Sequence, residues 1–452
     1  MNIVIAGMGK IGATLVSRLA SEGHDLVIID TDSVELGEVA NVYDVMGVCG
    51  SASDCNTLTE AGVGNAELFV ASTGSDELNM LSCFLAKRLG AKNTIARIRN
   101  PEYNDNSLGF LRHELDLAMA INPERLAAHA LFNILKLPSA MKLETFSRRN
   151  FEMIELKLKA DSPLDGVTLS AMRLKYKAKF LVCAVLRGER VFIPDGNFEL
   201  KSGDRIGLTA APTELERLLH DIGEYRPGAK NVMILGGSRT AYYLAKKLIA
   251  AGSSVKLIER DEALCIELCN LLPNATIING DGAKQELLLE EGLRSADAFV
   301  SLTGMDEQNI LISYFAADQG VPKVITKINR SELAPLAQRL NLDSVISPRR
   351  AVADVIVSYA RALSNSVGSR VDTLYKLMDG KAEALEFTAA SDLSFLSKPL
   401  RELKLKPNTL IAGIIRDRHP IIPTGNDSVL AGDKVIVFTA EQNFDDLSDI
   451  IA

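Results

Sequence analysis

One pattern of residues occurs twice in this chain, and that repeat is the strongest constraint on its fold. NIVI at residues 2–5 returns as NVMI at residues 231–234, and TGSDE at residues 73–77 returns as TGMDE at residues 303–307. A chain of 452 residues is also too long for a single hydrophobic core. The sequence therefore predicts two similar halves that meet near residue 228.

Apolar strands alternate with helices in the first part of each half. In the first half we expect strands at residues 2–6, 25–30, 45–49, 67–72, 94–98 and 117–121. We expect helices at residues 10–22, 54–61, 76–89 and 123–136, and one ending near residue 42. Uninterrupted apolar strands separated by helices predict a parallel sheet covered on both faces. The predicted fold class is α/β, with a Rossmann-like, doubly wound parallel sheet in each half.

A smaller domain follows each of these sheets. From about residue 150 the pattern changes to short alternating strands joined by Gly and Asp turns, with a helix at residues 213–222. These features recur as well, since Gly203-Asp204 matches Gly432-Asp433. We predict Rossmann-like domains at residues 1–137 and 229–363, and small α+β domains at residues 138–228 and 364–452.

A glycine-rich turn directly follows the first strand and opens a helix. It reads Gly7-Met8-Gly9-Lys10-Ile11-Gly12. Gly7 permits the tight turn, Gly9 lets the backbone approach a pyrophosphate, and Gly12 lets helix and strand pack closely. Free N–H groups at the start of the helix can then bind phosphates. This turn predicts a nucleotide-binding site, although a glycine-rich packing turn would have the same sequence.

Residues at the carboxyl ends of other strands are expected to complete the pocket. Asp30 ends the second strand, where its carboxylate can bind ribose hydroxyls and would repel a 2′-phosphate, so NAD(H) is favoured over NADP(H). Ser51 and Thr73 follow the third and fourth strands. Lys10 either adds charge near the phosphates or is a solvated helix lysine. Arg97 either reaches an anionic ligand or a neighbouring chain, or forms a structural ion pair.

The second half contains an altered copy of the turn. It reads Gly236-Gly237-Ser238-Arg239-Thr240-Ala241. Ser238 replaces the second glycine and places a Cβ where a phosphate would approach. Glu259 keeps the ribose-binding acid, and Asp281 lies in a glycine-containing loop. This copy predicts either a site for a nucleotide, bound more weakly or of a different kind, or a turn without a ligand.

Composition argues against several classes of protein. The formal net charge of −8 argues against a nucleic-acid binder. No apolar run approaches the length of a membrane span, and no secretory leader precedes the first strand, so we expect neither. The six cysteines form no CxxC pair, and Cys265 and Cys269 have no second pair of ligands nearby. We therefore expect small apolar cysteines in a reduced cytosolic protein and no metal site.

The sequence offers no recognisable catalytic site. Its five histidines do not repeat between the halves, and none lies in a catalytic motif. A dehydrogenase needs a domain that holds substrate and an acid–base group, whereas the small domains are short and rich in turns. We expect a protein that senses a nucleotide and catalyses no reaction. An NAD-dependent oxidoreductase and a nucleotide-free structural adaptor are the alternatives.

Several stretches resemble a known family. GMGKIG, LVIID, ASTGSDELNML and TIARIRNPEY resemble the RCK (KTN) nucleotide-binding domain, and SPLDGVTL and GDRIGLTA resemble its C-terminal subdomain. Two such units in one chain, without a membrane segment, are similar to the peripheral regulatory subunits of bacterial Trk potassium uptake systems. The resemblance covers essentially the whole chain.

This resemblance implies a cytoplasmic ring, typically a homotetramer, that binds a potassium-translocating integral-membrane subunit at the inner face of the cell membrane. It implies NAD(H) and adenine nucleotides such as ATP or ADP as ligands, without ranking them. By position, it assigns the first pocket to Gly7, Gly9, Gly12, Asp30, Ser51 and Thr73, and the second to Gly236, Glu259, Asp281 and Thr303.

Overall fold

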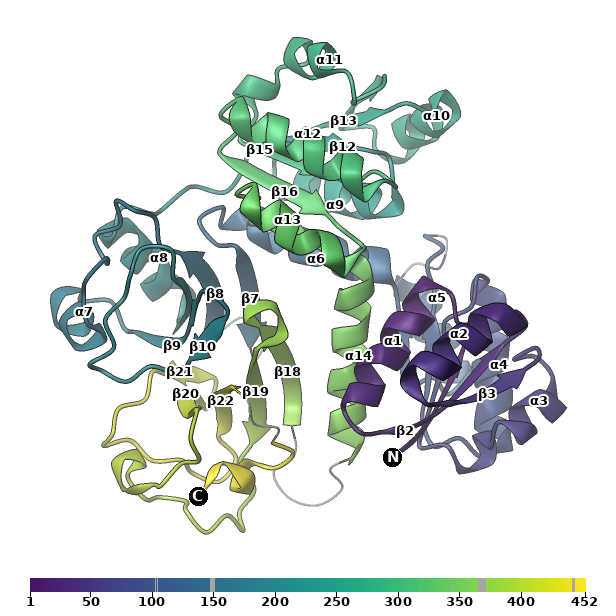
Figure 1. Cartoon of the computed structure of the whole chain (residues 1–452), viewed down its shortest axis with the longest axis horizontal. Helices are drawn as coiled ribbons and strands as arrows, with labels where there is room; N and C mark the ends of the chain where they lie inside the picture. Colours follow the sequence, from purple (N-terminus) through teal and green to yellow (C-terminus); the bar gives the residue numbers. More distant parts are fainter. Residues whose placement is uncertain (102, 104, 147–150, 343, 365–370, 441–443) are drawn as a thin grey trace. The chain divides into compact units, whose positions relative to one another are not determined.

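The computed structural model describes residues 1–452 except 102, 104, 147–150, 343, 365–370 and 441–443 (Figure 1). In the described residues, two six-stranded parallel sheets alternate along the chain with two five-stranded sheets whose neighbouring strands are antiparallel. The predicted fold class, two Rossmann-like domains each followed by a small α+β domain, is therefore confirmed.

The first parallel sheet has the strand order β3-β2-β1-β4-β5-β6. Its strands are β1 (Asn2–Ala6), β2 (Asp25–Asp30), β3 (Met46–Cys49), β4 (Leu68–Ala71), β5 (Thr94–Arg97) and β6 (Met119–Ile121). Its helices include α1 (Lys10–Ser21), α2 (Ser33–Tyr43), α3 (Cys55–Glu60), α4 (Asp76–Leu89) and α5 (Asp105–Glu114). Central strand β1 is buried from Ile3 to Ala6, as its uninterrupted apolar sequence predicts. The order reverses between β1 and β4, which is where ligands bind in open α/β sheets.

The second parallel sheet repeats this order as β14-β13-β12-β15-β16-β17. Its strands are β12 (Asn231–Leu235), β13 (Ser254–Glu259), β14 (Thr276–Asn279), β15 (Ala298–Ser301), β16 (Lys323–Lys327) and β17 (Val345–Ile346). Its helices include α9 (Arg239–Ala250), α10 (Glu262–Leu271), α11 (Gln285–Glu290), α12 (Asp306–Asp318) and α13 (Ala334–Arg339). The internal repeat in the sequence is thus a repeat of topology.

The two small domains also share one plan, in which a buried aspartate pairs with an arginine. The first contains β7 (Lys142–Phe146), β8 (Phe151–Lys157), α7 (Leu169–Lys175), β9 (Phe180–Arg187), β10 (Arg190–Phe192), β11 (Arg205–Ala210) and α8 (Pro212–Asp221). The second contains β18 (Val371–Leu377), β19 (Ala382–Thr388), β20 (Thr409–Arg416), β21 (His419–Ile421) and β22 (Lys434–Ala440). Asp204 accepts two hydrogen bonds from Arg187, and Asp433 accepts two from Arg416.

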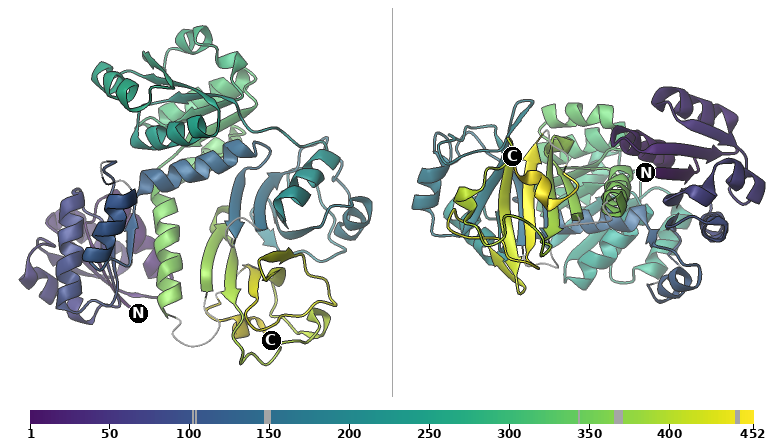
Figure 2. Two further views of the ribbon diagram at one scale, coloured as in Figure 1. Left: turned by 180° about the vertical axis from the view of Figure 1, so that it is seen from behind. Right: turned by 90° about the horizontal axis from the view of Figure 1, so that it is seen from below.

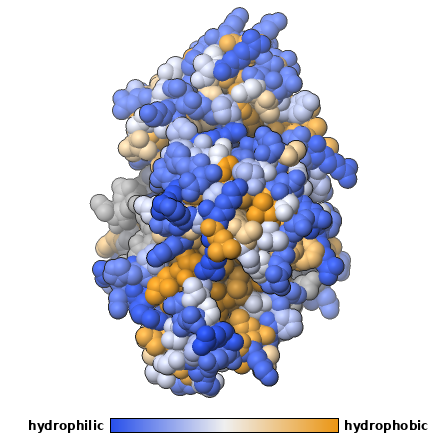
Figure 3. Space-filling view, turned by 90° about the vertical axis from the view of Figure 1, so that its left-hand side faces the viewer, coloured by the Kyte–Doolittle hydropathy of each residue, from blue (hydrophilic) through white to orange (hydrophobic). Residues whose placement is uncertain are grey.

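The small domains share a hydrophobic core, and their sheets lie side by side in Figure 2. Phe146 and Phe151 of the first lie in one buried cluster with Met378 and Phe438 of the second. Buried Glu155 links the domains further, because it accepts a hydrogen bond from the backbone of Met378 at 3.0 Å. On the face shown in Figure 3, several apolar patches lie in the lower half of the view.

Two long helices each contribute residues to both compact units of the chain. One unit comprises Met1–Ala127 and Ser347–Ala360, and the other comprises Ala128–Ile346 and Arg361–Ala452. Most of α14 (Pro348–Ser364) therefore belongs with the first sheet (Figures 1 and 2). There Tyr359 donates a hydrogen bond to Asn93 at 3.2 Å. From Ala128 onward, α6 (Pro123–Lys136) belongs with the second unit.

All six cysteines are free thiols. Cys83, Cys183 and Cys265 are buried, as expected for small apolar residues. Cys49, Cys55 and Cys269 are exposed. In the part of the chain that the structure describes, no helix combines the length and hydrophobicity that a bilayer span requires.

Candidate nucleotide-binding site

The fold itself requires two of the three glycines in the first turn. Gly7 has φ +93°, and a Cβ built on it would lie 2.7 Å from the backbone nitrogen of Thr73. A Cβ built on Gly12 would lie 1.9 Å from the carbonyl oxygen of Gly7. Any larger residue at either position would therefore separate the turn from β4 or from α1.

Gly9 is different, because neither conformation nor packing requires a glycine there. Its φ is −57°, which any residue adopts, and a Cβ built on it would have nothing within 4 Å. Gly9 is also the N-cap of α1, and no side chain of the described residues caps this helix. The first N–H groups of α1 consequently lack a side-chain cap, and such a helix start favours an anion.

Asp30 fastens the turn to the loop that follows β2. Its Oδ2 accepts a hydrogen bond from the backbone N–H of Met8 at 2.5 Å, and its Oδ1 accepts one from Asp32 at 2.9 Å. Asp32 in turn caps α2. The acid predicted to bind ribose therefore lies beside the glycine turn, while the side chain of Met8 is buried.

The remaining predicted residues of the first half lie at the same edge of the sheet. Ser51 follows β3, and its hydroxyl lies 2.8 Å from that of Ser53. Lys10 is exposed and Ile11 is half-buried at the start of α1. Arg97 ends β5 and donates to the carbonyl oxygen of Ser72 at 3.4 Å.

Sequence reasoning missed the residue that joins two of these loops. Asn79 is fully buried, and its Oδ1 accepts hydrogen bonds from the backbone N–H and the hydroxyl of Thr73 at 2.8 and 2.7 Å. Its Nδ2 donates to the carbonyl oxygen of Arg97 at 2.9 Å. Asn79 thus fixes the ends of β4 and β5 relative to each other. Its repetition as Asn309 was the signal in the sequence.

The second half reproduces most of this arrangement. Gly236 has φ +95°. Glu259 accepts hydrogen bonds from the backbone N–H of Gly237 at 2.6 Å and from those of Arg260 and Asp261 at 2.7 and 2.9 Å. Asp281 accepts one from the backbone of Ala283. The acidic residue holds the turn in both halves.

Ser238 is the main departure from the first turn. Its hydroxyl oxygen accepts a hydrogen bond from the backbone N–H of Ala241 at 3.4 Å and caps α9. Arg239, which replaces Lys10, is exposed. The start of α9 is therefore capped by its own chain, whereas the start of α1 is not.

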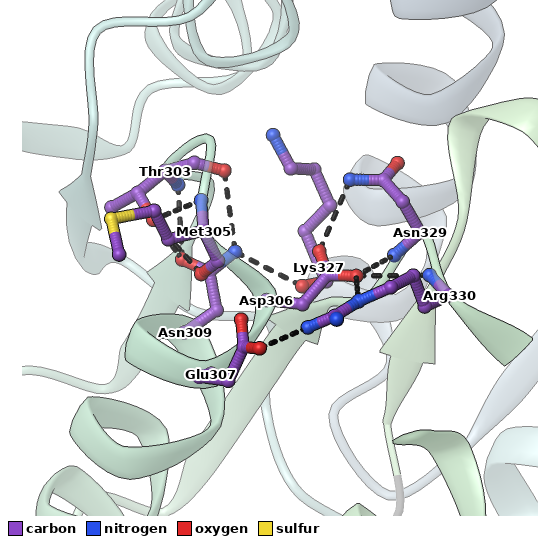
Figure 4. A network of polar contacts seen from close by, with 8 residues as sticks. All are labelled: Thr303, Met305, Asp306, Glu307, Asn309, Lys327, Asn329 and Arg330. Carbon is purple, nitrogen blue, oxygen red and sulfur yellow. Dashed lines mark hydrogen bonds and ion pairs between the residues drawn. The ribbon is translucent and has the colours of Figure 1, made fainter. Parts of the chain in front are cut away.

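Figure 4 shows the polar network at the ends of β15 and β16. Asn309 accepts hydrogen bonds from the N–H and hydroxyl of Thr303 and donates to the carbonyl oxygen of Lys327. Buried Asp306 accepts hydrogen bonds from the backbone of Asn329 and Arg330 at 3.0 and 2.9 Å. Arg330 also pairs with Glu307, and this bond lowers the pKa of the Glu307 carboxyl below its ordinary value. Lys327 stands where the first half has Arg97.

A cavity of about 770 Å³ opens beside this network. Arg260, Asp281 and Met305, which follow β13, β14 and β15, form part of its wall, together with the outer face of α12. Its volume lies in the range of small-molecule sites. The structure thus brings the predicted Asp281 close to Arg260, a residue outside the predicted site.

Comparison with known families gives two kinds of match, each present twice. The TrkA-N domain matches residues 3–112 and 232–348, and the TrkA-C domain matches residues 153–223 and 384–452. The chain is also 32% identical to the Trk system potassium uptake protein TrkA homolog 1 of Methanosarcina mazei, over 97% of each chain. The chain belongs to the TrkA family. The predicted resemblance to Trk regulatory subunits is confirmed at the level of the family.

Solved structures with the fold of this TrkA-family chain include that of the GsuK RCK domain. Its TM-score is 0.64 at 18% identity, and the match covers 97% of this chain and 92% of that one. The GsuK channel bound to NAD matches with a TM-score of 0.62 at 18% identity, over 97% of this chain and 77% of that one. At this level of identity, the likeness shows the fold.

Proposed function

We propose that this TrkA-family chain is the cytoplasmic regulatory subunit of a potassium uptake transporter, attached to the inner face of the membrane through a potassium-translocating partner. Nucleotide binding changes the conformation of the regulatory subunit and thereby the activity of the partner. The observation that supports this most directly is the open, uncapped start of α1 beside Asp30.

The first turn favours a nucleotide with two or more phosphates. The backbone N–H groups after Gly9 would bind phosphate oxygens, and Asp30 would bind ribose hydroxyls. Arg97 supplies a positive charge at the same edge of the sheet. NAD(H), ADP and ATP share the ribose and the diphosphate, so each is a candidate ligand.

A nucleotide regulates the chain only if it binds two conformations with different affinity. The binding loops follow β1, β2, β3, β4 and β5. A ligand that contacts several of these loops therefore changes the relative free energies of conformations in which the loops are placed differently. Asn79 transmits such a change between Thr73 and Arg97, because it is bonded to both. The role requires no bond to be made or broken in the ligand.

Self-association into a ring, with four chains as the expected number, is part of the proposal. Exposed apolar side chains occupy equivalent positions on α4 and α12, where Leu81 is 47% and Leu311 is 65% exposed. Tyr314 lies one turn further along α12 and is 48% exposed. Repeated apolar positions on the surface favour contacts between copies of a chain.

The test is potassium flux into vesicles that contain the membrane partner and this chain, with and without NADH, NAD, ADP or ATP. We expect at least one nucleotide to change the flux, and Asp30→Ala to remove that response. Unchanged flux at saturating nucleotide would contradict the proposal. An absorbance assay for NADH oxidation distinguishes an oxidoreductase, and we expect no turnover.

A further inference from the structure

The two glycine turns differ at a position that the fold leaves free. Gly9 and Ser238 have nearly the same φ, −57° and −63°. A Cβ at position 9 would meet no described atom within 4 Å. The backbone therefore accommodates either residue, and the choice between them must come from something other than the turn itself.

In the second half, the hydroxyl of Ser238 occupies the start of the helix. It accepts the hydrogen bond of Ala241 N–H, one of the N–H groups that a phosphate would use. Its Cβ also stands at the position of the second glycine of the motif, which lets the backbone approach a diphosphate most closely. At the start of α1, no side chain in the part of the chain that the structure describes forms such a cap.

A second difference concerns the residue at the third glycine position of the motif. A Cβ on Gly12 would lie 1.9 Å from the oxygen of Gly7, which no real structure permits. Ala241 holds the equivalent position and has its Cβ there, fully buried. The geometry around Ala241 must therefore differ from that around Gly12, so that the Cβ has room. The second turn thus differs in shape as well as in capping.

Glu259 does not by itself indicate a second ligand. It accepts three backbone hydrogen bonds, from Gly237, Arg260 and Asp261, so the turn needs this acid even without a nucleotide. Asp30 has the same structural task in the first half, where the helix start is open. The open helix start, and not the acid, distinguishes the two halves.

We infer that Ser238 closes the second turn to the diphosphate of a nucleotide, so that each chain binds one nucleotide, in its first half. This inference rests on the proposed function, because it states which of two equivalent turns binds the ligand. Ser238 is then the residue that sets the number of nucleotides bound per chain.

Titration calorimetry of the full chain with NADH and with ADP measures that number. We expect one nucleotide per wild-type chain, lost in Asp30→Ala and retained in Glu259→Ala. Gly9→Ser places the second-half residue into open space, so the variant should fold, and we expect at least a tenfold loss of affinity. Gly109→Ser, on α5 with equally open surroundings, is the matched control and should bind as the wild type does.

The reverse substitutions open the second turn. We expect Ser238→Gly combined with Ala241→Gly to bind two nucleotides per chain. Two nucleotides of equal affinity in the wild-type chain would overturn the inference and leave the proposed function intact. A double variant that still binds only one would also overturn it. If neither the wild type nor the double variant bound any nucleotide, that result would contradict the proposed function instead.

Discussion

The Asp30 carboxylate accepts a hydrogen bond from the backbone N–H of Met8 at 2.5 Å, and Glu259 does the same for Gly237 at 2.6 Å. A carboxylate at the end of the second strand thus holds the glycine turn in both halves. In the first half, the same group would also bind ribose. Its removal should therefore affect both stability and ligand binding.

Asp30→Ala should weaken nucleotide binding by about tenfold or more, which corresponds to about 1.4 kcal/mol. It should also lower the free energy of unfolding by about 1–3 kcal/mol, because two backbone N–H groups lose their acceptor. Calorimetry and urea unfolding measure the two effects. Glu35→Ala, an exposed acid on α2, is the control and should change neither. An unaltered dissociation constant in Asp30→Ala would contradict the site.

Asn79→Ala should shift the urea midpoint of the first unit downward. The substitution leaves the N–H and hydroxyl of Thr73 and the carbonyl oxygen of Arg97 without their buried partner, at a cost of about 1–3 kcal/mol. Asn309→Ala should have the same effect in the second half. Asn56→Ala, exposed on α3, should leave the midpoint unchanged. Equal midpoints for Asn79→Ala and Asn56→Ala would show that Asn79 does not hold the two loops.

Leu311→Asp and Leu81→Asp should lower the oligomeric state of the purified chain. Each places a charge in an apolar position that the proposed ring would bury, and a buried unpaired charge is costly. Light scattering coupled to size exclusion gives the mass of the assembly. Leu174→Asp is the matched control, since Leu174 on α7 is 89% exposed. A mass that is the same in all three variants and the wild type would exclude these surfaces from the assembly.

Alkylation of thiols should report the nucleotide site. Cys49 pairs with Asp30 in the register of β2 and β3 and is exposed. A bound nucleotide should therefore slow the modification of Cys49 several-fold while leaving that of Cys269 on α10 unchanged. Residue-resolved mass spectrometry gives both rates. Equal rates at Cys49 with and without ligand would place the nucleotide elsewhere.

The free energy of unfolding should fall at alkaline pH because of a buried thiol. Burial raises the pKa of Cys183 from 9.0 to about 12. The unfolded chain loses this proton from about pH 9, whereas the folded chain keeps it until about pH 12. The contribution of Cys183 to the free energy of unfolding is therefore fully present below pH 9 and falls as the pH rises through that window. Cys183→Ser should reduce this alkaline loss of stability.

Local sequence patterns predicted most of the elements at the two parallel sheets. Strand β1 and helix α4 have the predicted bounds, because their periodicity and caps are local properties. Helix α5 was missed because the Pro, Asn and Asp residues before it are typical of a loop. Helix α7 was missed because it is a single short helix in a domain rich in turns.

The candidate site was predictable only in part. Gly7, Gly9 and Gly12 were identified from their spacing, and their different roles became clear only from the space around each one. The role of Asn79 depends on β5, which lies far along the chain, so no local pattern contains it. The packing of α14 in the first unit also depends on contacts between residues that are far apart in the sequence, such as that of Tyr359 with Asn93.

The position of α14 in the first unit has a consequence for biosynthesis. Residues 347–360 complete the packing around a sheet whose last strand ends at Ile121. More than two hundred further residues must therefore leave the ribosome before that sheet acquires its final helix. Until then, the apolar surface that this helix covers is exposed to solvent or to a chaperone.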